Sequence, residues 1–424
     1  MTIPHLIFRL RHPPSSCHFI PTTHPALKSV PYILSKSKDQ IICHIPNDKI
    51  IDLSFIHELT SISFDPGSIT PQICRSLFVA LYNKGFLQKT RQRSSLLTRI
   101  YLPPSSRPDI EFYQRIQPIQ QALESPASHF IPQSGAALVR KIAKRYQRNH
   151  VSLRIYSGQQ LRRHGFGGIY AIGHSSKAAP CLTILHYRPP RPKTRWALIG
   201  KGVTFDMGGH NLKPDEDGKM KMDKLGAMTA LILFMEIVER KLPMETWCIL
   251  PFVENRIGPD AVLPGSIITL YGGETLNINN TDAEGRILLA DCLGWARQHC
   301  PADTTLHTLA TLTHYSELIT QEKGALIYGN HPDIDRISQM ATRLGEYSWP
   351  MPVWPMYQEM TRSNIANYQV TKDRPHNMGS MYAAAFLSNF VGENRWIHMD
   401  ISMTDKPYDF VMVRPLMKYF QKLE

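Results

Sequence analysis

The sequence predicts an α/β protein of two domains: a small N-terminal α/β domain over residues 1–125 and a larger three-layer α/β/α domain over residues 126–424. A chain of 424 residues exceeds the size at which one hydrophobic core stops growing, so we expect it to divide. The stretch 94–118 is rich in Ser, Pro and Arg, which is typical of an exposed connection. Beyond it, helix and strand patterns alternate, which favours helices on both faces of a central sheet.

The small domain contains one helix pattern and two strand patterns. Residues 71–85 carry apolar residues at helical spacing and end on Gly85, a residue type that commonly terminates helices. Short apolar and β-branched runs at 49–56 and 96–102 predict strands. Together these elements predict a mixed α/β unit.

The larger domain alternates between the two patterns along its length. A basic amphipathic helix is predicted at 136–148, and a long apolar helix at 225–240. The continuous apolar runs at 179–187 and 195–205 are typical of strands that are covered on both faces. The remaining predictions are a helix at 285–299 and strands at 152–156, 246–253, 305–312 and 396–401.

The composition is that of an ordinary folded chain. Hydrophobic residues make up 42% of it, and no run reaches the roughly 18 apolar residues that a membrane helix needs. The seven cysteines are scattered without a CxxC pair, which indicates neither a disulfide framework nor a zinc knuckle. Prolines between residues 4 and 31 would break the amphipathic helix of a transit peptide. We therefore expect a soluble protein of the cytoplasm.

The net charge of +13 is large and raises the question of a nucleic-acid partner. The excess is not localised, because residues 1–125 hold 14 Lys and Arg against 8 Asp and Glu, and the rest is spread over the longer second part. A solvated basic surface explains this distribution better than a nucleic-acid site does.

Two segments carry charged residues at positions where a simple turn needs none. The segment 199–213 is rich in glycine, which lets a backbone pass close to a ligand, and it carries Lys201, Asp206 and Lys213. Asp223 stands immediately before the long apolar helix. Taken singly, Lys201 is most simply a surface lysine at a strand end, and Asp223 a helix cap.

The segment NTDAEGR at 280–286 is more informative. Asp282, Glu284 and Arg286 alternate with small residues, so an extended backbone would point all three side chains the same way. Two carboxylates on one face beside a buried sheet repel each other unless a positive group lies between them, which predicts a bound cation. Singly, Asp282 fits a turn and Arg286 a salt bridge, but the three segments together favour a metal site.

These segments make the chain resemble a known family. NTDAEGR with the following ILLADCL, together with GKGVTFD at 200–206, Lys213 and Asp223, resembles the leucyl (cytosol) aminopeptidase family of dinuclear-metal peptidases. ALVRKIAKRY, ATLT, SWPMPVW and WIHMDIS add to the likeness, which covers about residues 130–424. The first hundred or so residues match the family only in general character. The resemblance implies a mixed central sheet in the larger, catalytic domain.

The resemblance also implies the metal ligands. Lys201, Asp206, Asp223 and Glu284 would hold one ion, and Asp206, Asp282 (side chain and backbone carbonyl) and Glu284 the other. The implied cofactors are two divalent ions per subunit, Mn²⁺ or Zn²⁺, since carboxylate-rich sites tolerate several metals. Four carboxylates match the charge of two such ions, and the lysine would have to ligate as the free amine.

The activity implied by the resemblance is release of the N-terminal residue of a peptide by a hydroxide that bridges the two metals. Lys213 would be the electrophile that polarises the scissile carbonyl, and Arg286 would hold a bicarbonate ion as general base. The implied substrates are peptides with a free N-terminal amine, and the implied assembly is a homo-hexamer that needs no membrane.

Several positions depart from the family's usual pattern. Met207 stands in place of a serine, Lys224 in place of an apolar residue or glycine, and His314 in place of a glycine. At 402–405 the chain reads SMTD where the family has small residues. We expect a substrate pocket more polar than a leucine-preferring one, and competition by Lys224 for the Asp223 carboxylate.

Two other interpretations stay open at this point. A basic oligomer of the same family could bind nucleic acid, and a steep fall of DNA affinity with salt would support that role. A degenerate member could keep the ligands and lose turnover through the altered loops. The presence of Lys213 and Arg286 argues against the second interpretation.

Overall fold

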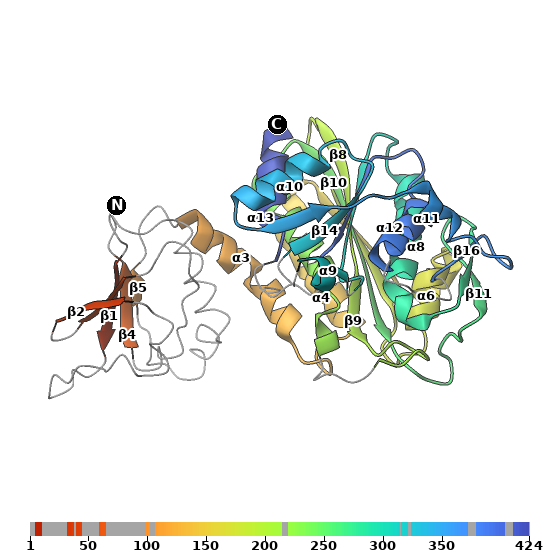
Figure 1. The fold of residues 1–424 in the computed structure, drawn as a ribbon, viewed down its shortest axis with the longest axis horizontal. Coiled ribbons are helices and arrows are strands. Elements are labelled where there is room, and N and C mark those ends of the chain that lie inside the picture. The colour runs from red at the N-terminus through yellow and green to blue at the C-terminus, as the bar shows by residue number, and fades with distance from the viewer. Residues whose placement is uncertain are drawn as a thin grey trace. The chain divides into compact units, whose positions relative to one another are not determined.

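The computed structural model divides into two compact units, residues 1–117 and 118–424 (Figure 1). The structure describes five strands within residues 1–106, and beyond them residues 107–213, 219–313, 315–320, 324–371, 379–402 and 410–423. Helix α3 (Arg107–Glu124) runs from the first unit into the second.

The first unit contains a sheet of order β2-β3-β1-β4-β5. Its strands are β1 (His5–Leu10), β2 (Tyr32–Ser37), β3 (Gln40–His44), β4 (Leu59–Phe64) and β5 (Arg99–Tyr101). Strand β5 falls within the strand predicted at 96–102. The strand predicted at 49–56 and the helix predicted at 71–85 lie outside the described residues.

The second unit is built on a nine-stranded sheet of order β15-β14-β17-β13-β8-β10-β7-β6, in which β9 pairs with β10 beyond β8. Strands β17, β13, β8 and β10 are parallel neighbours, whereas β14 and β7 join this core in antiparallel fashion. This arrangement confirms the predicted mixed sheet. The strands are β6 (Val151–Ser157), β7 (Cys181–Tyr187), β8 (Thr194–Gly200), β9 (Gly202–Asp206), β10 (Met244–Asn255), β13 (Thr305–Ala310), β14 (Gly324–Gly329), β15 (Tyr347–Pro350) and β17 (Trp396–Asp400).

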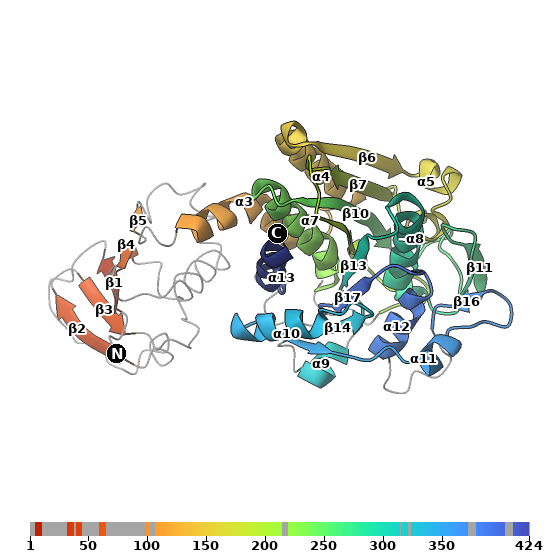
Figure 2. The ribbon, with the colours of Figure 1, turned by 90° about the horizontal axis from the view of Figure 1, so that it is seen from above.

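Helices cover both faces of this sheet, which confirms the three-layer prediction (Figure 2). One face carries α4 (Pro132–Tyr146), α7 (Leu225–Glu239), α10 (Ile334–Arg343) and α13 (Val413–Phe420). The other face carries α6 (Gly167–Gly173), α8 (Glu284–His299) and α12 (Gly379–Ser388).

Short elements complete the described part. They are η4 (Gln147–Asn149), α5 (Gln159–Arg163), β11 (Ser266–Thr269), β12 (Thr275–Ile278), α9 (Tyr315–Thr320), α11 (Pro355–Glu359), β16 (Tyr368–Gln369) and η8 (Gln421–Leu423). Among the helices described, none combines the length and apolar character that a membrane crossing requires.

Helix α7 packs directly on the sheet because two glycines leave room for it. A Cβ atom at Gly200 would meet Ala227 Cα at 2.5 Å, and one at Gly226 would meet the Leu309 carbonyl oxygen at 2.2 Å. These approaches put the first turn of α7 on the ends of β8 and β13. The helix is apolar on nearly all sides, as predicted for 225–240, and it is buried along almost its whole length.

Two local predictions were wrong. The single strand predicted at 195–205 is broken at Lys201, whose amide donates to Leu309 O at 2.9 Å and whose carbonyl accepts from Ala227 N at 2.7 Å. Residues 282–286 are not extended, because η6 (Thr281–Ala283) leads straight into α8. The Asn280 side chain accepts a hydrogen bond from Asp282 N at 2.8 Å, and this cap favours a helical start over a strand.

Candidate metal centre

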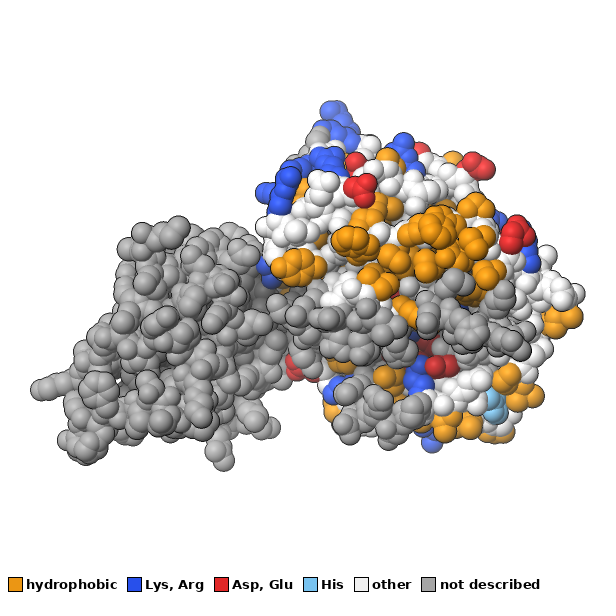
Figure 3. Space-filling model, in the orientation of Figure 1, with side chains coloured by type: hydrophobic (Ala, Val, Ile, Leu, Met, Phe, Trp, Pro, Cys, Tyr) orange, Lys and Arg blue, Asp and Glu red, His pale blue; other side chains and the backbone are white. Residues whose placement is uncertain are grey.

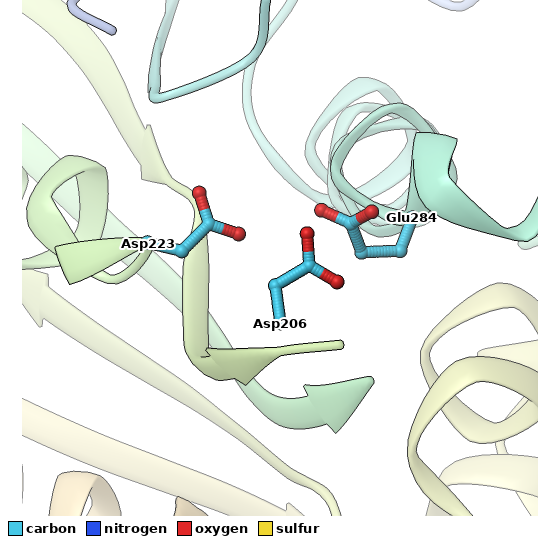
Figure 4. A group of neighbouring side chains, drawn as sticks. All are labelled: Asp206, Asp223 and Glu284. Carbon is cyan, nitrogen blue, oxygen red and sulfur yellow. The ribbon is translucent and has the colours of Figure 1, made fainter. Parts of the chain in front are cut away.

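Strand ends and a helix start bring the candidate ligands together. Lys201 lies between β8 and β9, Asp206 is the last residue of β9, and Glu284 is the first residue of α8. Asp223 lies between η5 (Lys219–Met222) and α7. Figure 4 shows three carboxylates converging, and one oxygen each from Asp206, Asp223 and Glu284 lies within 4.8 Å of the others. This edge of the sheet is where α/β proteins usually bind ligands.

Lys201 is buried between two of these carboxylates. Its side chain is 4% exposed, and Nζ lies 2.9 Å from Asp223 Oδ2 and 2.7 Å from Glu284 Oε1. Burial lowers the pKa of Lys201, but the neighbouring carboxylates outweigh burial and raise it above its ordinary value. Lys201 is therefore an ammonium ion in this setting, and it can serve as a metal ligand only after losing a proton.

Lys213 joins two further candidate residues. Its Nζ lies 3.0 Å from Asp206 Oδ2 and also contacts Asp282 Oδ1. Burial lowers the pKa of Lys213, but Glu284, Asp206 and Asp282 outweigh burial and raise it. A charged Lys213 agrees with the electrophilic role implied by the resemblance.

These residues form a cluster with an excess of negative charge. We call it the carboxylate–lysine cluster, and its members are Lys201, Asp206, Lys213, Asp223, Asp282 and Glu284. Four carboxylates face two lysines, which leaves two negative charges in excess when all six groups are ionised. Burial and the nearby Glu284 raise the pKa of Asp206 to about 6, and burial raises that of Asp223 well above its ordinary value. The cluster thus has fewer positive groups than negative ones.

The donor set of this cluster fits divalent metal ions. Glu284 Oε2 is a buried carboxylate oxygen with no hydrogen-bond partner among the described residues. Leaving an anionic oxygen unpaired in the interior is costly, and a cation removes that cost. Carboxylate oxygens with one amine nitrogen suit Mn²⁺ or Zn²⁺.

A hydrogen-bond network ties the loop after β9 to η6. Asn255, the last residue of β10, donates from Nδ2 to Asp206 Oδ1 at 2.8 Å and to Thr281 O at 3.0 Å. The Gly208 amide donates to Asp206 Oδ1 at 2.9 Å, and Thr281 Oγ1 donates to Gly208 O at 2.6 Å. These bonds fix Asp206 relative to the segment that carries Asp282.

Arg286 lies two residues beyond Glu284 on α8 and is buried. Its Nη1 donates to Val370 O at 2.8 Å, and its Cζ lies 5.7 Å from the centre of the Tyr382 ring. Its Nε is buried and has no acceptor among the residues that the structure describes. An unused buried guanidinium donor is suited to a small anion.

Lys224 does not pair with Asp223 as expected. It is fully buried, but its Nζ donates to the Lys221 carbonyl and lies 5.1 Å from the centre of the Phe130 ring. Burial lowers the pKa of Lys224 to about 7. Asp223 is instead held by Lys201 and by Thr311, whose Oγ1 donates to Asp223 Oδ1 at 2.6 Å.

The other departures from the family pattern are only partly visible. The Met207 amide donates to Asn255 O at 2.9 Å, and its carbonyl accepts from Lys213 N at 3.0 Å. His314 and residues 403–409 lie outside the described part of the chain. The polar substrate pocket therefore stays a prediction.

Comparison with known proteins shows which family the chain belongs to. The model of the "Cytosol aminopeptidase family, catalytic domain" matches residues 119–412. The chain belongs to this family. The match confirms the resemblance predicted from the NTDAEGR segment.

Individual cytosol aminopeptidases show how far the similarity reaches. A probable cytosol aminopeptidase of Syntrophotalea carbinolica is 37% identical over 260 residues, 60% of this chain and 51% of the relative. One from Desulfotalea psychrophila is 32% identical over 285 residues, 66% of this chain and 55% of the relative. The chain thus spans about half the length of these curated relatives. The crystal structure of cytosol aminopeptidase from Coxiella burnetii matches with a TM-score of 0.75 at 25% identity and covers 85% of this chain and 80% of that one.

Three polar residues that support the site were not singled out from the sequence as site residues. Asn255 ends β10, Asp400 ends β17, and Thr311 directly follows β13. Each stands where a buried strand stops, at the edge of the sheet that carries Lys201. A polar residue at the end of an otherwise apolar strand is the signal that could have found them in a cytosol aminopeptidase.

Proposed function

We propose that this protein is a metal-dependent aminopeptidase that hydrolyses the N-terminal residue from peptides. The observation that carries the proposal is the convergence of Asp206, Asp223 and Glu284 within 4.8 Å around a buried lysine. Membership of the cytosol aminopeptidase family supports the same activity.

The proposed ligand sets follow the resemblance. Lys201, Asp206, Asp223 and Glu284 hold one divalent ion, and Asp206, Asp282 and Glu284 hold the other. Mn²⁺ or Zn²⁺ in these places would supply Lewis acidity toward the scissile carbonyl. The unpaired Glu284 Oε2 supports a ligand role for this residue on both ions.

Lys213 is the proposed electrophile. Its ammonium lies against Asp206 and Asp282. Once these two carboxylates serve as metal ligands, the ammonium can donate to the carbonyl oxygen of the scissile peptide. A preorganised cation at that oxygen stabilises the negative charge that develops there.

Arg286 is proposed to hold a bicarbonate ion, which would supply a general base. The buried and unused Nε supports anion binding, while the bond from Nη1 to Val370 O fixes the plane of the guanidinium. A planar guanidinium can offer a carboxylate-like anion two donors at once.

The proposed substrates are peptides with a free N-terminal amine. A free N-terminal amine could bind one of the proposed metal ions, and an internal peptide bond has no such amine to offer. The cytoplasm is the proposed location, and the free thiols of Cys181, Cys248, Cys292 and Cys300 are compatible with a reducing compartment.

We also propose a homo-hexamer, which the resemblance implies. Figure 3 shows hydrophobic side chains gathered on one face of the second unit. The exposed large hydrophobic residues of the described part include Tyr347, Trp349, Trp354, Met356 and Ile365. Exposed apolar surface of this kind is what subunit contacts cover. Light scattering coupled to size exclusion measures the assembly directly.

The activity is tested on chelator-stripped protein reloaded with Mn²⁺ or Zn²⁺ and offered a panel of aminoacyl amides. We expect hydrolysis only after reloading, and none from a Glu284→Ala variant treated in the same way. Reloaded wild-type protein that binds metal and cleaves no member of the panel would refute the proposed function.

The same panel tests the polar pocket. We expect amides of basic or polar residues to be cleaved better than leucine amide. A rate for leucine amide equal to or above the others would contradict that prediction and leave the aminopeptidase proposal standing.

A further inference from the structure

Three neighbouring strands end beside the carboxylate–lysine cluster. Strands β8, β13 and β17 are parallel, with Leu309 opposite Gly200 and Ala310 opposite Asp400. Lys201 and Thr311 are the first residues beyond β8 and β13, and Asp400 is the last residue of β17. The same edge of the sheet therefore carries Lys201, Thr311 and Asp400, with Thr311 one residue beyond Ala310, the register partner of Asp400.

Thr311 bonds to two of the proposed ligands of one metal ion. Its carbonyl oxygen accepts a hydrogen bond from Lys201 Nζ at 2.7 Å, and its Oγ1 donates to Asp223 Oδ1 at 2.6 Å. A lysine that ligates as a free amine has two N–H bonds and one lone pair. An acceptor for one of those N–H bonds sets the direction of the lone pair, as the outer partner of a ligating histidine does.

Asp400 fixes the loop that carries Thr311. Its carboxylate is fully buried and accepts from Leu312 N at 3.2 Å, Thr313 Oγ1 at 2.7 Å and Ser402 Oγ at 2.6 Å. Thr313 N in turn donates to Ser402 Oγ at 3.1 Å. Hydrogen bonds to a charged acceptor are stronger than neutral ones, so this loop is held firmly.

The other half of the cluster has separate support. Asp206 and the segment with Asp282 are tied together by Asn255 and Thr281. Thr311 bonds Lys201 and Asp223, the two proposed ligands that belong to one ion and are not shared with the other. Loss of the Thr311 hydroxyl should thus affect one ion and spare its neighbour.

We propose that Thr311 is a positioning residue that orients the side chains of Lys201 and Asp223 for their metal ion. Asp400 acts through Thr311 by fixing the loop that carries it. This inference rests on the proposed function for its ligand sets. It assigns to Thr311 and Asp400 a role in the relative affinity of the two ions.

The test compares Thr311→Val with Thr311→Ser in the full chain. Valine keeps the shape of threonine and removes the hydroxyl, whereas serine keeps the hydroxyl. Chelator-stripped proteins are titrated with Mn²⁺ by calorimetry. We expect two ions in the wild type and the serine variant, and a loss of about 10- to 100-fold in affinity for one ion in the valine variant.

Thr308→Val is the matched control, at a threonine three residues earlier in the chain. Thr308 is buried in β13, and its Oγ1 accepts from Trp396 Nε1 at 3.1 Å. Loss of this hydroxyl should lower thermal stability and leave both metal affinities unchanged. If Thr311→Val and Thr308→Val have the same effect on metal binding, or if Thr311→Val weakens both ions equally, the positioning role is wrong.

Asp400→Asn tests the second part of the proposal. Asparagine keeps the size of the side chain but replaces one acceptor oxygen with a donor. We expect the same loss of affinity for one ion as in Thr311→Val. The double variant should show little further loss of affinity, because both substitutions disturb the position of Thr311. Independent, additive losses would overturn the assignment of Asp400.

Metal titration separates this inference from the proposed function. A wild type that binds two Mn²⁺ ions, with a valine variant that loses one, supports the positioning role even if no aminoacyl amide is cleaved. A wild type that binds no ion overturns both.

Discussion

The larger unit carries two clusters of charged residues at opposite ends of the same strands. The two clusters differ in their ratio of positive to negative groups. At the amino end, Arg195 on β8 and Glu245 on β10 are paired in register. Glu245 Oε1 accepts from His186 Nε2 at 2.9 Å and from Arg188 Nε at 3.2 Å, and Oε2 accepts from Arg195 Nε at 3.1 Å. We call this group of four residues the Glu245 cluster.

The difference shows what separates a structural ion cluster from a ligand site. In the Glu245 cluster one carboxylate is bonded by two arginines and one histidine, and both of its oxygens are bonded. In the carboxylate–lysine cluster four carboxylates share two lysines, and Glu284 Oε2 has no partner among the described residues. Both clusters contain ion pairs and a buried glutamate. A deficit of positive charge, and not the burial of a glutamate or its pairing, distinguishes the second cluster as the proposed cation site.

The largest expected contrast comes from the same substitution in each cluster. Glu284→Gln should lower kcat/KM by at least about 100-fold, because Glu284 is the ligand that both ions share in the proposed centre. Glu245→Gln should leave turnover of the reloaded protein unchanged. Steady-state hydrolysis and metal analysis of both variants check this prediction. A similar loss of kcat/KM in both variants would show that the two clusters do not differ in function.

Metal ions should stabilise the protein through one cluster only. At a Mn²⁺ concentration about 100 times the dissociation constant, the free energy of unfolding should rise by about 2.7 kcal/mol per site. We expect the rise in the wild type and in Glu245→Gln, and its loss in Glu284→Gln. Denaturant titrations with and without Mn²⁺ measure it, and an equal rise in all three proteins would contradict the ligand assignment.

Without added metal, the order of stability should reverse. Glu245→Gln should lower the free energy of unfolding by about 1–3 kcal/mol, because it weakens hydrogen bonds to charged donors. Glu284→Gln should cost less or stabilise the chain, since it removes excess negative charge. Denaturant unfolding of chelator-dialysed proteins is the measurement; a larger cost for Glu284→Gln would show that the site is balanced without cations.

The sequence predicts the elements of both regions but not how they meet. The apolar runs of β8, β10 and β13 and the alternation with helices fix the layers. The order β17-β13-β8 depends on pairing between distant segments, such as the bond from Thr311 to Asp223, 88 residues apart. Local patterns do not encode such pairings, so the support given by Thr311 and Asp400 was not predicted.

The candidate ligands were implied by the resemblance of three segments to a known family, whereas their geometry could not be predicted. Alternation in the segment 282–286 suggested a strand, but the cap from Asn280 starts a helix there. Lys224 was expected to compete for Asp223 because the two are adjacent in sequence, yet the Lys224 ammonium turns to the Lys221 carbonyl. Two residues that are adjacent in sequence need not point their side chains toward each other once a helix begins.

Acidification should weaken the Glu245 cluster. Burial lowers the pKa of His186, so its contribution to stability is present above about pH 6.5 and is lost as the pH falls below that value. Burial raises the pKa of Glu245, but His186, Arg195 and Arg188 outweigh it and lower the value. The Glu245 contribution is therefore lost only below about pH 4.5.

A His186→Gln variant isolates the first of these steps. Between pH 7.5 and 5.5, the wild type should lose more unfolding free energy than the variant, because only the wild type has an imidazole that takes up a proton more readily in the unfolded chain than in the fold. Denaturant midpoints at both pH values give the difference, in which all other titrating groups cancel. Parallel pH profiles would show that His186 does not contribute.

The smallest effect is expected from Arg188→Ala. The Arg188 side chain is 71% exposed, and exposed ion pairs contribute at most about 1 kcal/mol. Glu245 keeps His186 and Arg195 as partners in this variant. A thermal unfolding midpoint close to that of the wild type is the expected reading, and a large drop would mean that the Glu245 cluster depends on all of its partners.

The two glycines beneath α7 have a consequence for protein engineering. Because Gly200 and Gly226 let the helix rest on the sheet, its seating depth determines where the Asp223 carboxylate stands relative to Lys201. An added methyl group at either glycine would lift the helix and displace that carboxylate while every ligand kept its identity. A mutant library that aims to alter the ion preference of this enzyme fold could therefore begin at these two positions, outside the coordination sphere.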